Sequence, residues 1–454
     1  MRNWNRLFVR QGFLLEEINE GVFDCQNESR ENIAFLMETL EELFVDYVLA
    51  NGVLKILSKT VLESEWLKAV NFDFRGRTEI LQSKTLVLKE LDTYMAGAIR
   101  QLNRLGLTTS YCCDGHKQRH PRIGFVNEVD MEKVKKVLKI LGVSRWQIHN
   151  QNITLGSDRH QLLDLAEQLS HFSPEMMEES IEEIKKQLFF KELETCLLID
   201  GESGYEDSIR EHVLNRLDGL VDHVAVDCKG NILAQKVSGH GRGSVILLNA
   251  HLDTIYGFDE GRQILKDGNI WTSSKGILGA DDRAGVAVLL ELAKEIPNSK
   301  FNGTVIFIFT VEEEIGLVGA KNVAEYFLWD VDAAFVADRR DHGDIVTSCG
   351  GYLDFCDEAF GTFLEDVAKD AGLEGWKCTA GGSSDTRIWA SQGIQSVNLS
   401  VGYQNEHTSD EVLDVEACYG TFQLLSAILN EGKEVMKVVR NISKRDTNTF
   451  KQLV

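Results

Sequence analysis

Four nearly uninterrupted apolar runs in the second half of the chain constrain its fold more than any other feature. They are VILLNA at residues 245–250, TVIFIFT at 304–310, AAFVA at 333–337 and SVNLSV at 396–401. Strands buried on both faces have this composition, whereas strands with one solvated face alternate apolar and polar residues. Helical patterns separate the runs, so we expect an α/β fold with a mostly parallel central sheet flanked by helices.

The first half of the chain has a different pattern and predicts a smaller helical and α+β region. Residues 1–65 carry Glu, Leu and Phe at helical spacing, and the N-terminus is typical of an amphipathic helix. Residues 66–185 alternate helices and short strands, and a helix after Ser173 leads into the next part. We therefore predict a helical segment at 1–65, a small α+β domain at 66–185 and the α/β domain at 186–454.

Composition excludes several classes of partner. The 454 residues are 43% hydrophobic and 26% charged, as in ordinary globular proteins, and the formal net charge is −23. Nucleic acid and anionic membranes would repel such a surface, and no apolar run approaches the roughly 18–20 residues that span a bilayer. The nine cysteines are odd in number and lack framework spacing, which favours a reducing compartment. We expect a cytoplasmic protein with no nucleic-acid and no membrane partner.

Histidines and acids follow the ends of the apolar runs. Ligands of open α/β sheets bind beyond the carboxyl ends of the strands, so these side chains should converge. Singly, each has a structural explanation, such as a helix cap or a hydrogen-bonded core histidine. Together, two histidines and three acids meet the donor demand of two divalent cations about 3.5–4 Å apart, with one further acid for proton transfer. The candidates are His251, Asp253, Asp281, Asp282, Glu312, Glu313, Glu314, Asp338 and His407.

Five short motifs resemble, in order, those of the co-catalytic zinc exopeptidases, metallopeptidase clan MH, which include leucyl-type and tetrahedral aminopeptidases, tripeptidase and related deacylases. The resemblance covers about residues 189–440, and SGYEDSIREHV and DCKGNIL are similar to the entry of such a domain. The motifs are HLDT, GADDRAG, EEEIGLVGA, the aspartate of FVADRR, and NEHTSDE.

The resemblance implies a role for each matched residue. His251 and Asp338 would hold one metal, Glu314 and His407 the other, and Asp281 would bridge both. The metals would be two divalent ions, zinc first, with cobalt or manganese also compatible with the donors.

The resemblance also implies residues beside the metals. Glu313 would be the general base and acid, and Asp253 would orient His251 through its second ring nitrogen. The Asp281-Asp282 peptide bond would be cis. Asp385 and Glu411 match weaker family positions beside the active site and would at most support the ligands, since loop capping explains both residues almost as well.

These parts predict a di-metal hydrolase that acts through a metal-bridging hydroxide, which forms when Glu313 accepts a proton from the bridging water. The leading prediction is an aminopeptidase that removes N-terminal residues from short peptides. The alternatives are an amidase or deacylase of N-acyl amino acids and a catalytically silent binding protein on the same scaffold. The short spacing between Asp338 and His407 leaves no room for the lid domain of the tripeptidase branch. The N-terminal region would then cover the active-site rim or mediate homo-oligomer formation.

Two further features have ordinary and functional interpretations. The Cys112-Cys113-His116 cluster could be a metal site or a thiol centre, but its spacing matches no standard zinc framework. A strand followed by an Asp-Gly turn is the favoured interpretation. Arg283 and the Arg339-Arg340 pair could receive a substrate carboxylate or could pair with neighbouring acids.

Overall fold

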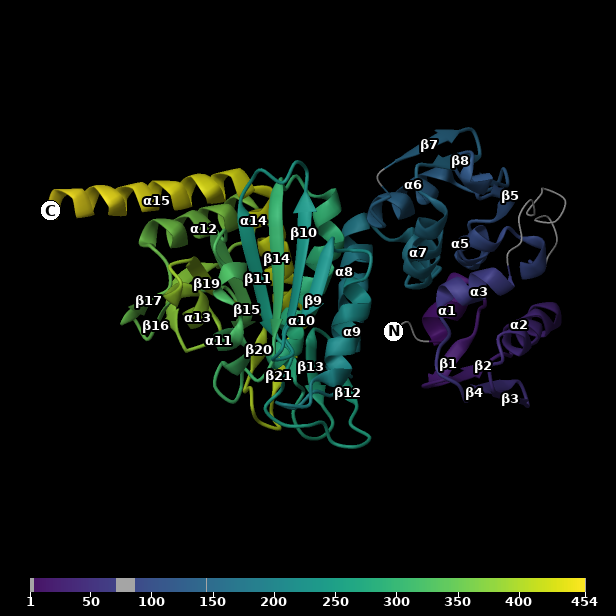
Figure 1. Cartoon of the computed structure of the whole chain (residues 1–454), viewed down its shortest axis with the longest axis horizontal. Coiled ribbons are helices and arrows are strands. Elements are labelled where there is room, and N and C mark those ends of the chain that lie inside the picture. The colour runs from purple at the N-terminus through teal and green to yellow at the C-terminus, as the bar shows by residue number, and fades with distance from the viewer. Residues whose placement is uncertain (1–3, 71–85, 144, 454) are drawn as a thin grey trace. The chain divides into compact units, whose positions relative to one another are not determined.

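The computed structural model describes residues 4–70, 86–143 and 145–453, and side chains up to residue 445. The chain divides into two compact units, Met1–Leu188 and Phe189–Val454, and each is described by itself (Figure 1). The linking helix α8 (Ile181–Leu197) runs across this boundary. Among the described residues, no helix combines the length and the apolar composition needed to span a membrane.

The second unit is built on a central sheet whose middle is parallel, as predicted. Strands β11 (Val245–His251), β14 (Gly303–Thr310), β15 (Ala333–Arg339) and β19 (Gln395–Ser400) confirm the four apolar runs. The sheet order is β17-β16-β19-β15-β11-β14-β10-β9, with β18 beside β16. β10 and β9 continue the sheet antiparallel on one side, and β16 pairs antiparallel with β19 on the other. These outer strands are β9 (His223–Val226), β10 (Ile232–Ser238), β16 (Asp344–Cys349), β17 (Leu353–Asp354) and β18 (Lys377–Gly381).

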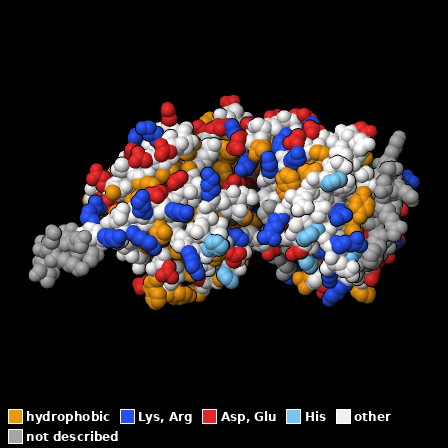
Figure 2. Space-filling model, turned by 90° about the horizontal axis from the view of Figure 1, so that it is seen from above, with side chains coloured by type: hydrophobic (Ala, Val, Ile, Leu, Met, Phe, Trp, Pro, Cys, Tyr) orange, Lys and Arg blue, Asp and Glu red, His pale blue; other side chains and the backbone are white. Residues whose placement is uncertain are grey.

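Charged side chains of both signs cover the surface despite the acidic excess. The chain has 71 acidic and 48 basic residues. On the face shown in Figure 2, Lys and Arg side chains lie among Asp and Glu side chains. On that face the negative charge is therefore distributed rather than gathered in one patch.

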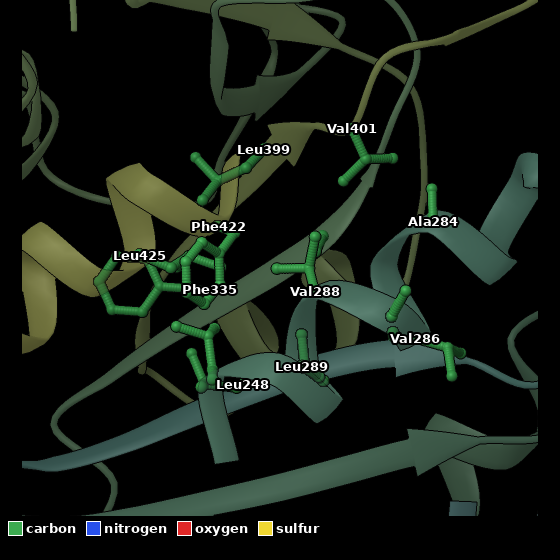
Figure 3. Packing of buried hydrophobic residues seen from close by; sticks show 14 of the residues in the cluster. Leu248, Ala284, Val286, Val288, Leu289, Phe335, Leu399, Val401, Phe422 and Leu425 are labelled. Atoms are coloured by element: carbon green, nitrogen blue, oxygen red, sulfur yellow. The ribbon is translucent and has the colours of Figure 1, made fainter. Parts of the chain in front are cut away.

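Helices cover the sheet and build the main core. Helix α10 (Ala280–Glu295) is buried along almost its whole length, and its Val288 and Leu289 pack with Leu248 of β11 and Phe335 of β15 (Figure 3). Helix α14 (Val415–Asn430) adds Phe422 and Leu425 to the same cluster. The remaining helices of the unit are α9 (Asp207–Leu217), α11 (Val318–Asn322), α12 (Glu358–Asp370), α13 (Thr386–Ser391) and α15 (Gly432–Leu453), with short 3₁₀ turns at η4 (Ile296–Asn298) and η5 (Glu325–Phe327).

A small antiparallel sheet carries the loop between the fourth strand and the last helices. It has the order β12-β13-β21-β20. His407 lies between its last two strands, so this sheet anchors the loop from both ends. The strands are β12 (Ile264–Asp267), β13 (Ile270–Ser273), β20 (Tyr403–Gln404) and β21 (Val412–Asp414).

The prediction of helices throughout residues 1–65 is wrong. Helices α1 (Trp4–Arg10), α2 (Arg30–Glu42) and α3 (Glu63–Ala69) are present, but a four-stranded antiparallel sheet accompanies them. Its second hairpin turns at Asn51 and Gly52, both at positive φ, which is the conformation that an Asn-Gly hairpin turn requires. The strands are β1 (Glu16–Asn19), β2 (Val22–Asp24), β3 (Tyr47–Ala50) and β4 (Val53–Ile56).

The rest of the first unit confirms the predicted α+β pattern. Its sheet has the order β5-β6-β8-β7. Helices α5 and α7 pack against each other, and Gly97 lets α5 approach Arg10 and Ala166 closely. Part of the predicted 66–185 domain, residues 71–85, lies outside the described residues. The elements are η1 (Leu88–Glu90), α5 (Thr93–Arg104), β5 (Thr109–Cys113), η2 (Gly115–Lys117), β6 (Arg122–Phe125), α6 (Met131–Ile140), β7 (Trp146–His149), β8 (Asn152–Leu155), α7 (Arg159–Ser170) and η3 (Glu175–Glu178).

Candidate functional site

The structure brings all five predicted metal ligands together at the carboxyl edge of the parallel strands. His251 is the last residue of β11 and Asp338 lies near the end of β15. Glu314 follows β14, where Thr310 ends the strand. Asp281 lies at the start of α10, and His407 comes from the loop between β20 and β21. Five segments far apart in the sequence therefore supply one cluster.

Asp281 lies between the two histidines. Its Oδ1 is 3.0 Å from His251 Nε2, and its Oδ2 is 3.1 Å from His407 Nε2. On one side, Asp338 Oδ1 is 3.7 Å from His251 Nε2. On the other, Glu314 Oε1 is 2.9 Å from His407 Nε2. The donors thus form two groups that share the Asp281 carboxylate.

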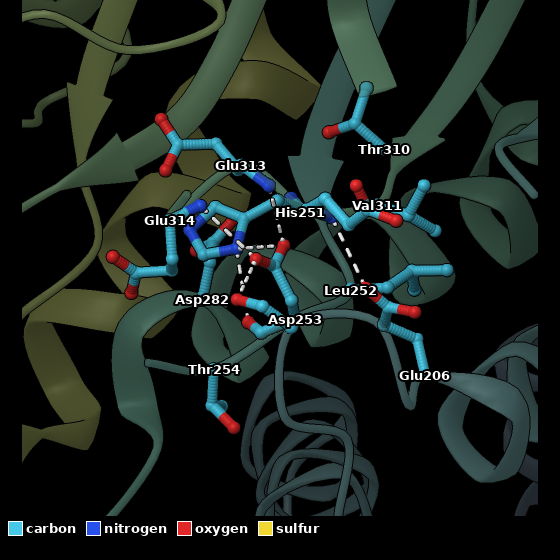
Figure 4. A network of polar contacts seen from close by, with 12 residues as sticks. Glu206, His251, Leu252, Asp253, Thr254, Asp282, Thr310, Val311, Glu313 and Glu314 are labelled. Atoms are coloured by element: carbon cyan, nitrogen blue, oxygen red, sulfur yellow. Dashed lines mark hydrogen bonds and ion pairs between the residues drawn. The ribbon is translucent and has the colours of Figure 1, made fainter. Parts of the chain in front are cut away.

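Asp253 connects His251 to the glutamate loop (Figure 4). The backbone carbonyl of Asp253 is 3.0 Å from His251 Nδ1, and its carboxylate Oδ1 is 3.2 Å from the same nitrogen. The carboxylate also accepts hydrogen bonds from the backbone N–H of Glu313 at 2.9 Å and of Glu314 at 3.1 Å. Ser203 Oγ donates a further bond at 2.7 Å. One buried side chain therefore fixes both the ring of His251 and the position of the two glutamates.

Asp282 has a supporting role that sequence reasoning did not assign. Its Oδ2 accepts a hydrogen bond from the backbone N–H of His251 at 3.1 Å, and its Oδ1 accepts one from that of Gly285 at 3.0 Å. The peptide bond between Asp281 and Asp282 is cis, as the family resemblance predicted. Asp282 therefore holds the end of β11 against the start of α10.

Three polar side chains that the sequence analysis did not single out support the ligands. Tyr403 donates its hydroxyl to Asp338 Oδ1 at 3.0 Å. Asn398 accepts from the backbone N–H of Asp338 at 3.0 Å and donates to its carbonyl oxygen. Ser203, in the loop before α9, reaches Asp253 as described. No spacing in the sequence marks these residues, because each comes from a segment that only the fold brings near.

The two weaker family positions both contact the site. Glu411 accepts hydrogen bonds from the backbone N–H of Gly279 at 2.7 Å and of Asp281 at 3.0 Å. Asp385 Oδ2 accepts a hydrogen bond from the hydroxyl group of Thr310, at the end of β14. Glu411 therefore holds the segment that carries Asp281, and Asp385 holds the end of the strand that leads to Glu313 and Glu314.

The electrostatics of the site reflect several carboxyl groups buried together. The pKa of Glu313 is raised to about 10, because burial disfavours its charged form and Asp338, Asp385 and Asp281 repel it. Burial and repulsion from Asp338 likewise raise the pKa of Asp385 to about 7, although its hydrogen bond from Thr310 opposes the shift. Burial would also raise the pKa of Asp281, but hydrogen bonds from His251 and His407 hold it well below its usual range. Divalent cations would offset this concentration of negative charge.

The arginines considered for a substrate carboxylate are paired within the protein. Arg283 matches neither of the two interpretations, because it is fully buried and donates to the carbonyls of Ile199 and Leu252. Arg339 pairs with Asp344 at 3.2 Å, and Arg340 pairs with Glu406. The neighbouring-acid interpretation holds for the last two.

Comparisons with known proteins found a family model and several relatives that resemble this chain. The M42 glutamyl aminopeptidase family model matches residues 256–424, a segment that contains every candidate except His251 and Asp253. The uncharacterized protein YqjE of Bacillus subtilis is 23% identical over 372 residues, covering 55% of this chain and 99% of that protein. A putative aminopeptidase of Acetivibrio thermocellus is 26% identical over 230 residues, covering 34% of this chain and 68% of that protein.

A solved structure supports the fold. The aminopeptidase PepT of Bacillus cereus has a TM-score of 0.50 at 19% identity, covering 54% of this chain and 98% of that one. The family model matches one segment of the second unit, and five motif residues converge at one edge of its sheet. Over residues 256–424, the second unit is similar to the M42 glutamyl aminopeptidase family.

Proposed function

We propose that this chain is a metallo-aminopeptidase that removes N-terminal residues from short peptides. The observation that supports the proposal most strongly is the position of Asp281, whose two carboxylate oxygens each face a different histidine. A carboxylate shared by two donor groups is what a pair of neighbouring divalent cations requires. The matching family model is described as a glutamyl aminopeptidase family.

The donor set fits two divalent cations, with zinc proposed as the metal. His251 and Asp338 would hold one cation, Glu314 and His407 the other, and Asp281 both. Imidazole and carboxylate donors suit zinc and are compatible with cobalt and manganese. When bound, such cations acidify water and polarise a carbonyl group.

The protein's own groups would then move protons and hold the loops. Glu313 would accept a proton from water and deliver it to the leaving amine. Asp253 keeps His251 oriented and fixes the backbone of Glu313 at the same time. Glu411 holds Asp281 in place through its backbone N–H.

The substrate proposal rests on the chemistry of a free α-amine. Such an amine could bind one cation and contact the nearby acidic side chains. An N-acyl amino acid lacks that amine, so the amidase or deacylase alternative predicts the opposite preference. The predicted cytoplasmic location and the homo-oligomer through the first unit stay predictions.

A substrate panel tests the proposal. Metal-loaded full-length protein is assayed on free-amine dipeptides and amino-acyl anilides, and on the same amino acids with acylated amines. We expect hydrolysis of the free-amine compounds and its loss after chelation. Preference for acylated substrates would support the deacylase, and full metal loading without hydrolysis of either class would support a silent binding protein.

A further inference from the structure

A second group of metal-ligand side chains lies in the first unit. It consists of Asp92, Cys113, Asp114 and His116, whose donor atoms all lie within 4.8 Å of one another. Cys113 ends β5, Asp114 and His116 lie in the turn that follows, and Asp92 immediately precedes α5 (Figure 1). The backbone confirms the predicted strand and turn, but only the fold adds Asp92 to them.

Three of these donors are spaced to surround one cation. Cys113 Sγ is 3.5 Å from His116 Nε2, and His116 Nε2 is 3.9 Å from Asp92 Oδ2. Zinc bonds of about 2.3 Å to sulfur and about 2.0 Å to nitrogen, at a tetrahedral angle, separate those two ligand atoms by about 3.5 Å. The sulfur and the nitrogen therefore lie at the distance that a shared tetrahedral ion requires, and the Asp92 oxygen lies within 4.8 Å of both.

Asp114 supplies the support that metal-binding histidines usually have. Its Oδ1 is 2.9 Å from His116 Nδ1 and accepts a hydrogen bond from the backbone N–H of His116. Its Oδ2 is 2.8 Å from Arg159 Nε, and the Arg159 guanidinium lies over the ring of Tyr94. A carboxylate on Nδ1 fixes the tautomer that leaves Nε2 for the metal.

The side chain of Asp92 is directed toward Asp114 and His116 and does not cap its helix. Asp92 occupies the N-cap position of α5, yet its side chain makes no capping hydrogen bond. Instead, the fully buried carboxylate accepts from the backbone N–H of Asp114 at 3.2 Å and faces His116. His116 itself has a left-handed backbone conformation, φ 50° and ψ 39°, which is unfavourable for a residue with a side chain.

We propose that Asp92, Cys113 and His116 bind one divalent transition-metal cation, with zinc as the best match, and that Asp114 positions His116. Three protein ligands leave a fourth coordination position free for water or a small ligand. A dication together with Arg159 balances the charges of the two aspartates and the Cys113 thiolate. A surface pocket is lined in part by Tyr94, Lys117 and Arg159, and Arg159 contacts Asp114 of the cluster.

The same contacts suit a thiol nucleophile less well. Cys113, His116 and Asp114 do form a chain of thiol, imidazole and carboxylate. However, Asp92 adds a second buried carboxylate within 4.8 Å of the sulfur, a donor that a metal ion would use and that a thiol-imidazole-carboxylate chain does not need. The observations therefore favour a metal over a cysteine nucleophile.

Cobalt loading of the full chain tests the proposal without using activity. Cobalt bound to Cys113 gives a thiolate-to-cobalt charge-transfer band, whereas the His and carboxylate donors of the second unit give none. We expect the band in the wild type and its loss in Cys113→Ala. Cys112→Ala is the matched control, because this neighbouring thiol is buried and outside the cluster, and we expect it to keep the band.

Two further variants separate this site from the peptidase centre. Asp114→Asn should keep the band but weaken cobalt binding about 10–100-fold, as loss of a supporting hydrogen bond does. Asp281→Asn should disturb metal binding in the second unit and leave the band unchanged, so failure of one site is distinguishable from failure of the other. Bound cobalt should also slow alkylation of Cys113.

Three results would overturn the proposal. The first is a wild-type protein without the charge-transfer band, and the second is a band that persists in Cys113→Ala. The third is rapid alkylation of Cys113 that depends on His116 and is insensitive to cobalt, which would indicate the nucleophile instead.

Discussion

At the scale of single residues, the candidate peptidase site depends on side chains that hold others in place. Asp253 contacts Nδ1 of His251 and accepts from the backbone of both Glu313 and Glu314. Asp282 and Glu411 similarly hold the backbone of His251 and Asp281. The geometry of the candidate metal centre therefore depends on carboxylates that need not touch a metal.

Replacing Asp253 by Asn should weaken metal binding. The amide offers one accepting oxygen in place of two and cannot serve Nδ1 of His251 and both backbone N–H groups. We expect metal affinity to fall about 10–100-fold, measured by competition with a chromogenic chelator. Ser203→Ala, which removes one hydrogen bond to the same carboxylate, should have a smaller effect; equal affinity in wild type and Asp253→Asn would contradict the assigned role.

Replacing Glu313 by Gln should separate catalysis from metal binding. We expect kcat to fall by about 10²–10⁴ while metal content stays at the wild-type level, because the group transfers protons without being a ligand. Glu312→Gln is the matched control. The Glu312 carboxylate pairs with Lys229 at 2.9 Å, so its loss should leave kcat nearly unchanged. The reverse ranking would show that the three glutamates are assigned one position out of register.

At the scale of elements, the site requires α10 to start very close to β15. A Cβ at Gly285 would lie 2.1 Å from the carbonyl oxygen of Ala337 and 2.5 Å from Asp282 Oδ1. The absence of a side chain at this position therefore brings the helix carrying Asp281 against the strand carrying Asp338.

Gly285→Ala should consequently destabilise the second unit and impair the site. We expect a loss of about 1–3 kcal/mol from overpacking, seen in urea unfolding, together with reduced metal binding. Gly420→Ala is the control, since Gly420 also lies inside a helix but has open space around it. There, alanine should stabilise the protein by about 0.5–1 kcal/mol. Similar effects at both glycines would contradict the packing argument.

The first unit is held together by an ion-pair network around Arg10 of α1. This buried guanidinium contacts Glu63 of α3 at 2.7 Å, and Asp164 and Glu167 of α7 at 2.6 and 2.9 Å. Burial alone would raise the pKa of Glu167, but Arg6 and Arg10 outweigh it and lower that pKa below 4.5. Glu167 therefore stabilises the fold above about pH 4.5, and this contribution is lost as pH falls through the lowered pKa.

Arg10→Met should cost about 1–3 kcal/mol, because it leaves partly buried carboxylates without their hydrogen-bonded cation. We expect a lower urea midpoint, with faster hydrogen exchange in α1 and α7. The loss of stability between pH 7 and pH 4 should also be smaller than in the wild type. An unchanged midpoint, or an unchanged pH dependence, would show that the network contributes little.

At the scale of the whole molecule, the sequence predicts the second unit far better than the first. Strands β11, β14, β15 and β19 are recognisable because burial on both faces leaves no polar alternation. The ligands follow from strand order, since parallel strands deliver their following residues to one edge. The first unit lacks such runs. The two strands that meet at Asn51 and Gly52 pair over only four residues each, and this is too short for the alternation of a strand to be distinguished from the spacing of a helix.

The sequence does not reveal the contacts that hold each site's residues in place when the two partners are far apart along the chain. Tyr403 and Asn398 reach Asp338 from about 60 residues away along the chain, and Asp92 joins Cys113 and His116 only through the packing of α5 on β5. Nothing in local spacing distinguishes these residues from others of their type. Contacts of this kind depend on the complete fold.

Anomalous diffraction from crystals soaked with zinc tests the central claim most directly. We predict two peaks in the second unit, on either side of the Asp281 carboxylate and about 3.5–4 Å apart, one beside His251 and the other beside His407. A single peak, or peaks away from Asp281, would contradict a shared-carboxylate centre and with it the proposed peptidase mechanism.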